Sequence, residues 1–159
     1  MTGTLIFALT LAAALGSALI AGVFFIFSVA VMPALARIAP AAGIAAMQSI
    51  NVTILNAWFF LAFFGTAAIS LFLVVAALAG WTEGRSAYLI AGCLLYVAGS
   101  VLVTGAFNVP LNTALGAAGP DSAEGSDLWA RYLSTWTVWN HLRAVASLGA
   151  AASFILALR

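Results

Sequence analysis

The sequence predicts an all-α integral membrane protein, a four-helix bundle with a short interfacial helix between the first and second spans. Its 159 residues are 65% hydrophobic and only 6% charged, whereas a soluble domain carries roughly a quarter charged residues. Its mean hydropathy is +1.19. The apolar residues form four long segments, and a helix needs ~20 such residues to cross a bilayer. We therefore expect one four-span transmembrane domain covering residues 1–159.

The first predicted span covers residues 5–32 and ends before Pro33, because proline lacks the amide donor and clashes with the preceding turn. It has no basic start and no clear cleavage site, so we interpret it as a span rather than a secretion signal. The Ala-rich stretch that follows predicts the interfacial helix. Pro40 suits its first position, and apolar residues then recur at three-residue spacing.

The second and third spans are expected at residues 52–79 and 87–107, joined by a short loop. Pro110 is expected to break the third helix, and residues 111–127, with their glycines, proline and three acids, to form an exposed loop. The fourth span is expected at residues 136–158. Four spans place the first and third connections on the same side of the membrane, so polar residues near both should gather at one end.

The few charged residues exclude several kinds of chemistry. All five basic residues are arginines, so there is no lysine for a Schiff base or a phosphate loop. The four acids lie in predicted loops, which argues against a carboxylate proton relay or a metal site within the membrane. Cys93 is the only cysteine, so it forms no internal disulfide and no zinc or iron–sulfur site alone. No basic tract indicates a nucleic-acid partner.

The fourth segment contains the most informative residues, in the run STWTVWNHLRAVAS. Trp136, Asn140 and Arg143 lie at positions i, i+4 and i+7, which is one stripe of a helix. His141 points roughly 100° away from Asn140. An imidazole and a guanidinium are costly to bury in a membrane, so both need partners.

Each of these residues has two interpretations. Arg143 either reaches the lipid headgroups and caps free carbonyls, or binds a phenolate or enolate oxygen. His141 is either a hydrogen-bonded structural residue or a general base, since it alone titrates near neutrality when unperturbed. A haem with His141 as axial ligand is a further alternative, although no second ligand is evident. The asparagines suit helix capping or a cavity wall, and the tryptophans suit interfacial belts.

Three runs together resemble the anthrone-oxygenase-like family of small four-helix membrane proteins. They are FFIFSVAVMPALARIAP…AMQSIN (residues 24–51), FNVPLN (107–112) and LWARYLSTWTVWNHLRAVAS (128–147). The resemblance implies a multi-pass protein of a bacterial inner membrane. It also implies an oxygenase that oxidises a lipophilic phenolic or polyketide-like substrate with O2, without a metal or organic cofactor.

What this resemblance implies for the site is a base, an oxyanion holder and an apolar pocket. His141 would be the base, Arg143 and Asn140 the oxyanion partners, and Trp139 a stacking wall. The remaining substrate-binding candidates are Asn51, Asn108, Asn112 and Trp136. No metal ligands are expected.

The main alternative is a non-enzymatic membrane protein that binds lipid or a small hydrophobic molecule, or an accessory subunit of a membrane assembly. Small residues on the first and third spans would then serve close helix packing, within the chain or in a homo-oligomer. A channel or transporter fits less well, because no acid and no broken helix lies at mid-membrane.

Overall fold

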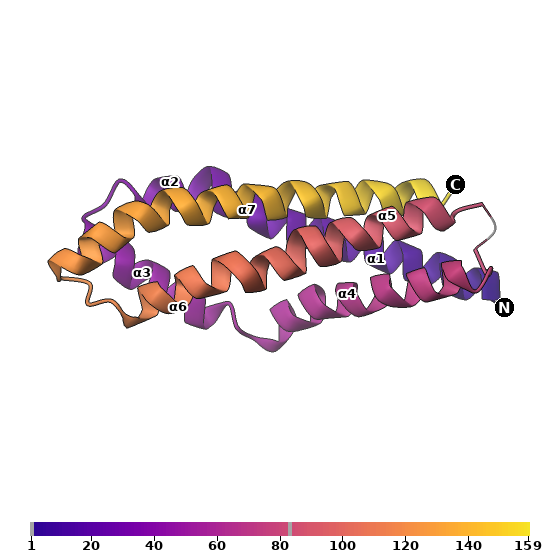
Figure 1. The fold of residues 1–159 in the computed structure, drawn as a ribbon, viewed down its shortest axis with the longest axis horizontal. Helices are drawn as coiled ribbons and strands as arrows, with labels where there is room; N and C mark the ends of the chain where they lie inside the picture. Colours follow the sequence, from indigo (N-terminus) through magenta and orange to yellow (C-terminus); the bar gives the residue numbers. More distant parts are fainter. Residues whose placement is uncertain (1, 83) are drawn as a thin grey trace.

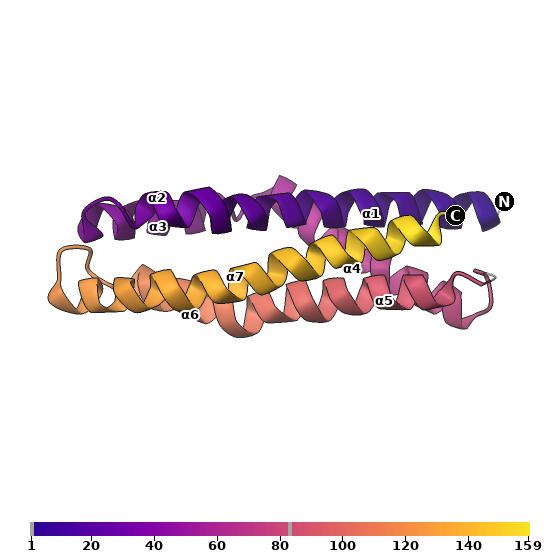
Figure 2. The ribbon, with the colours of Figure 1, turned by 90° about the horizontal axis from the view of Figure 1, so that it is seen from above.

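The structure is a computed structural model that describes residues 2–82 and 84–159, and the predicted loop acid Glu83 lies outside the described residues. All regular elements of the described residues are helices, which confirms the predicted all-α class. Its helices lie in four elongated rods with both termini at the same end (Figures 1 and 2).

The first rod is α1 (Thr2–Ile26), the π-helical segment η1 (Phe27–Val31) and α2 (Met32–Leu35). The second is α3 (Pro40–Thr53) and α4 (Ala57–Leu78). The third is α5 (Ser86–Tyr96), the π-helical segments η2 (Val97–Leu102) and η3 (Thr104–Asn108), and α6 (Val109–Ala117). The fourth is the single helix α7 (Ala123–Ala157).

Three stretches in the described part of the chain are long and apolar enough to cross a membrane: Gly3–Leu35, Ala57–Leu78 and Ser86–Ala117. They indicate a membrane protein. Helix α7 is as long, but its polar residues, including Asn140 and Arg143, make it less apolar. The fourth span, expected at residues 136–158, therefore stays a prediction.

Neither expected helix-breaking proline ends its helix. The first rod continues past Pro33 to Leu35, and the third continues past Pro110 to Ala117. In both rods a π-helical segment ends just before the proline, at η1 and η3. A proline ring clashes with the carbonyl four residues earlier. The wider π turn accommodates this clash, so the helix continues instead of breaking.

The rods are longer than a bilayer requires. The 22 residues of α4 extend about 33 Å, close to the ~30 Å of the hydrocarbon core, whereas the 35 residues of α7 extend about 52 Å. The predicted short helix is present as α3, which packs against α6 and α7 with Ile44 and Met47 buried. The second rod breaks at residues 54–56, so α4 begins later than the expected start at residue 52.

Several small residues allow the rods to approach closely. Gly16 of α1 lies against Thr66 of α4, and Gly92 of α5 lies against the ring of Phe154 in α7. The buried residues form two apolar clusters. One lies between α1, α4, α5 and α7 around Phe63, and the other surrounds α3 at the opposite end. The polar residues of interest lie where these two clusters meet.

Candidate functional site

A cavity of about 100 Å³ lies between the two apolar clusters and receives side chains from all four rods. Its walls are mostly aromatic and aliphatic, with four polar side chains among them. The lining residues are Val23, Phe24, Phe27, Met47, Ile50, Asn51, Ile54, Leu55, Phe59, Thr104, Val109, Asn112, Trp136 and Arg143. An apolar hollow with a few convergent polar groups is the usual form of a small-molecule site.

Arg143 is the charged group of this cavity and is only 5% exposed. Its Nη1 donates to the Thr104 hydroxyl at 3.1 Å and its Nη2 donates to Asn140 Oδ1 at 2.6 Å. Its guanidinium carbon lies 4.0 Å from the centre of the Phe24 ring and 5.3 Å from that of Trp136. Aromatic faces attract a desolvated cation, and here they stand where a carboxylate usually would.

The cation of Arg143 is not neutralised within the described chain, in which no salt bridge to it occurs. Its Nε is buried and has no hydrogen-bond partner. A buried charge left unpaired is strongly destabilising. Arg143 therefore keeps the capacity to bind a further acceptor group.

Asn140 holds Arg143 in position. It is fully buried, and its Nδ2 donates to the Phe24 carbonyl and to the Ser28 hydroxyl, both at 2.7 Å. Its Oδ1 accepts the hydrogen bond from Arg143. Both ends of the amide are thus occupied by the protein, so Asn140 positions the arginine and has no free group for a ligand.

The π-helical segments supply much of this polar network. Ser28 lies in η1, while Thr104 and Asn108 lie in η3. The Thr104 hydroxyl donates to the Ser100 carbonyl at 2.7 Å and accepts from Arg143. A π bulge shifts the register of the side chains that follow it, and such bulges are frequent at functional sites.

Asn112 forms the second polar end of the cavity. Its Oδ1 accepts hydrogen bonds from the Tyr132 hydroxyl and from Trp136 Nε1, both at 2.8 Å. Burial raises the pKa of Tyr132, so its phenol stays protonated and acts as a donor. The indole N–H can only donate, which fixes the orientation of the Asn112 amide.

The other two predicted asparagines differ from each other in position. Asn51 lines the cavity, and its Nδ2 is buried without a hydrogen-bond partner. Asn108 is fully buried beside the cavity, and its Nδ2 donates to the Trp136 carbonyl at 3.2 Å. Asn51 is therefore available to a ligand, whereas Asn108 binds α7 to the third rod.

His141 and Trp139 do not line the cavity. His141 is exposed on the outer surface of α7. Trp139 is half-buried and stacks on Phe107, with ring centres 3.6 Å apart and planes 8° apart. The structure therefore separates them from Arg143, and their roles as base and substrate-stacking wall stay predictions.

Three residues of the site were absent from the sequence-based prediction: Phe24, Thr104 and Tyr132. Tyr132 lies one turn before Trp136 on the predicted stripe of α7, so extending that stripe would have found it. Thr104 is a hydroxyl within an apolar segment, which is a weak signal. Phe24 is recognisable only from its position under the guanidinium.

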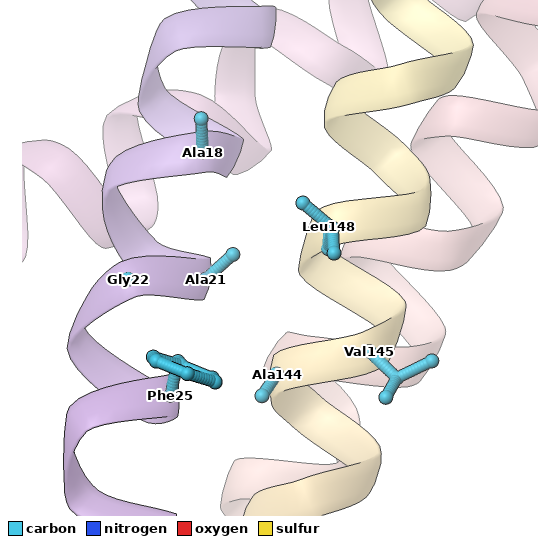
Figure 3. Close-up of a pocket in the computed structure, with 7 residues that line it drawn as sticks. All are labelled: Ala18, Ala21, Gly22, Phe25, Ala144, Val145 and Leu148. Carbon is cyan, nitrogen blue, oxygen red and sulfur yellow. The ribbon is translucent and has the colours of Figure 1, made fainter. Parts of the chain in front are cut away.

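A second hollow, of about 270 Å³, lies on the outside of the bundle between α1 and α7. Figure 3 shows that small side chains of α1 face Ala144 and Leu148 of α7 across it. None of its lining residues is polar or ionisable, so it offers no reactive group. Among the described residues, no group of three or more His, Cys, Asp or Glu side chains could hold a metal ion.

The family model described as anthrone oxygenase matches residues 58–153, which is more than half of the 159 residues. The match runs from the first turn of α4 into the last turns of α7 and includes Thr104, Asn112, Asn140 and Arg143. No curated protein and no solved structure matches the chain at a significant level. By this match, the chain belongs to the anthrone oxygenase family.

Proposed function

We propose that the protein is a multi-pass membrane oxygenase of a bacterial inner membrane, which oxidises a lipophilic phenolic or polyketide-like substrate with O2. The observation that carries this proposal is the buried cation of Arg143, which lacks a carboxylate partner and faces a cavity walled by aromatic rings. Membership of the anthrone oxygenase family supports the reaction class.

The proposed reaction begins with an activated C–H group conjugated to an aromatic ketone. Loss of its proton leaves an electron pair that is delocalised onto the ketone oxygen, and Arg143 stabilises that oxyanion with its hydrogen bonds and charge. The electron-rich carbon then reduces O2 and forms a C–O bond. Overall, a CH2 group and O2 become a C=O group and water, which balances atoms and electrons.

The position of His141 changes its proposed part in this reaction. Its side chain is exposed on the outer surface of α7, one residue beyond Asn140. A general base must lie within hydrogen-bond reach of the proton that it removes, directly or through one water. We therefore propose that Arg143 acidifies the substrate and that the proton leaves to water at the mouth of the cavity, without His141.

The cavity suits a substrate that enters from the side. Its 100 Å³ is below the ~300–1,000 Å³ of pockets that enclose a drug-sized ligand. Two of its lining residues, Leu55 and Val109, are 61% and 47% exposed and form its rim. A fused-ring substrate would thus place its reactive edge at Arg143 while the rest extends between the α3–α4 link and α6.

We propose that no metal or organic cofactor is needed, because an electron-rich carbanion reduces O2 directly. The alternative of a haem bound by His141 makes a clear spectroscopic prediction. The purified protein would then show a strong Soret band, which His141→Ala would remove. A colourless, active protein supports the direct route.

The deciding experiment compares Arg143→Met with His141→Ala for O2 uptake with an anthrone in detergent micelles. Removing one oxyanion donor typically costs about 10²–10³-fold in rate, and we expect at least that loss for Arg143→Met. His141→Ala should keep its rate within a few-fold. Full activity in Arg143→Met ends the proposal, and loss of activity in His141→Ala restores the histidine as base. Substrate binding without O2 uptake in the unaltered protein would favour the non-enzymatic alternative.

A further inference from the structure

The amide of Asn112 lines the cavity, and the described residues occupy its oxygen but neither of its two N–H groups. Its Oδ1 is occupied by the Tyr132 hydroxyl and Trp136 Nε1. A flipped amide would set its NH2 group against the indole N–H, so this orientation is the only one the donors allow. Its Nδ2 has no acceptor in the part of the chain that the structure describes, and Asn112 lines the cavity.

Asn112 and Arg143 both contact the Trp136 indole. The guanidinium carbon is 5.3 Å from the centre of the Trp136 ring, and Asn112 is bonded to the nitrogen of that ring.

An anthrone-type ligand carries its ketone oxygen and the carbon with carbanion character on opposite sides of one six-membered ring. When its oxyanion is bound at Arg143, that carbon is free to face Asn112, which lines the same cavity.

We propose that Asn112 Nδ2 donates a hydrogen bond to the oxygen that O2 adds to the substrate, which makes Asn112 a catalytic residue of the second half of the reaction. This inference rests on the proposed function. One electron passes from the carbanion to O2, and the resulting superoxide and carbon radical combine to a C–O–O⁻ peroxide. Water protonates the peroxide. The second proton then leaves the carbon, the O–O bond breaks, and hydroxide departs to become water.

Asn112 acts on the charged species of this sequence. Its N–H groups hold the superoxide next to the carbon radical and then stabilise the peroxide anion. Without them, superoxide escapes and disproportionates to hydrogen peroxide and O2, and the carbon radicals couple to each other. The quantity that reports the role of Asn112 is therefore the amount of quinone formed per O2 consumed, and not the rate alone.

The test compares Asn112→Leu, Asn112→Asp and the control Thr113→Val with an anthrone as substrate. Asn112→Leu should lower quinone formation about 10²-fold, release hydrogen peroxide, and reduce the quinone formed per O2. Asn112→Asp keeps the acceptor for Tyr132 and Trp136 but has no N–H groups. If the leucine variant does not fold, the quinone formed per O2 by the aspartate variant tests the role of those N–H groups. Thr113→Val changes the exposed neighbour of Asn112, whose hydroxyl bonds only the Val109 carbonyl among the described residues, and should keep the yield per O2.

One measurement needs no variant. The unaltered protein should bind a quinone about 3–10-fold more tightly than the ketone with the same rings and one oxygen, because only the quinone reaches both donors. Equal affinities, or unchanged yields in Asn112→Leu and Asn112→Asp, would overturn the role of Asn112. If these variants behave normally while Arg143→Met is inactive, this inference alone fails. If Arg143→Met is active, the proposed function fails.

Discussion

Replacing Asn140 by aspartate sets a carboxylate beside the Arg143 guanidinium without changing the size of the side chain. The atom that now accepts from Arg143 Nη2 at 2.6 Å remains an oxygen. The Ser28 hydroxyl can reverse its hydrogen bond and donate to the new oxygen. The Phe24 carbonyl loses its donor. The substitution therefore keeps the acceptor of the arginine while it neutralises the charge that we propose to hold the substrate.

The size of the effect follows from Coulomb's law. A ligand oxyanion on the far side of the guanidinium would lie about 7 Å from the new carboxylate, given two hydrogen-bond lengths and the width of the group. At an effective dielectric constant of about 20, two like charges at that distance repel by about 2.4 kcal/mol. Binding of an anionic ligand should therefore weaken about 50-fold.

The assay is calorimetric titration under anaerobic conditions, with an anionic hydroxyquinone and its neutral O-methyl ether as probes. In Asn140→Asp, the anion should bind about 50-fold more weakly and the ether almost unchanged. Asn140→Leu is the matched control, because it removes the hydrogen bond and leaves the charge. If Asn140→Asp binds the anion as tightly as the unaltered protein, Arg143 does not hold an oxyanion.

Two further predictions concern the packing that positions the site. Gly92→Ala places a methyl group 2.7–2.9 Å from the Phe154 ring and should lower the unfolding free energy by about 1–3 kcal/mol. Gly22→Ala has no neighbouring atom within 4 Å of the new methyl group. It should leave the unfolding free energy unchanged or raise it by up to about 1 kcal/mol. Thermal melting in detergent compares the two, and equal melting temperatures would contradict the packing. Asn56→Ala removes the acceptor for the first backbone amides of α4 and should lower the unfolding free energy by about 1 kcal/mol. Hydrogen exchange of those amides, which lie beside the cavity mouth, should become faster. Unchanged exchange there would refute the role of the cap.

The sequence alone determined the class of the protein and one helical stripe of its site. The excess of apolar over charged residues predicts a helical membrane protein, and the three long apolar helices indicate one. Trp136, Asn140 and Arg143 could be placed on one face because a single helix has a fixed period. That prediction depends only on residues close in sequence, and the structure buries the three side chains together near the cavity.

The tertiary structure decided what surrounds that stripe. Helical period relates residues within α7 but does not say which face turns towards the other rods, so His141 and Arg143 looked equally suited to the site. The π turns before Pro33 and Pro110 shift the side chains that meet α7, and a sequence gives no clear sign of such a turn. Phe24 and Thr104 contact Arg143, and Asn112 contacts Trp136. All three come from rods distant in sequence from α7, so only packing brings them to the stripe.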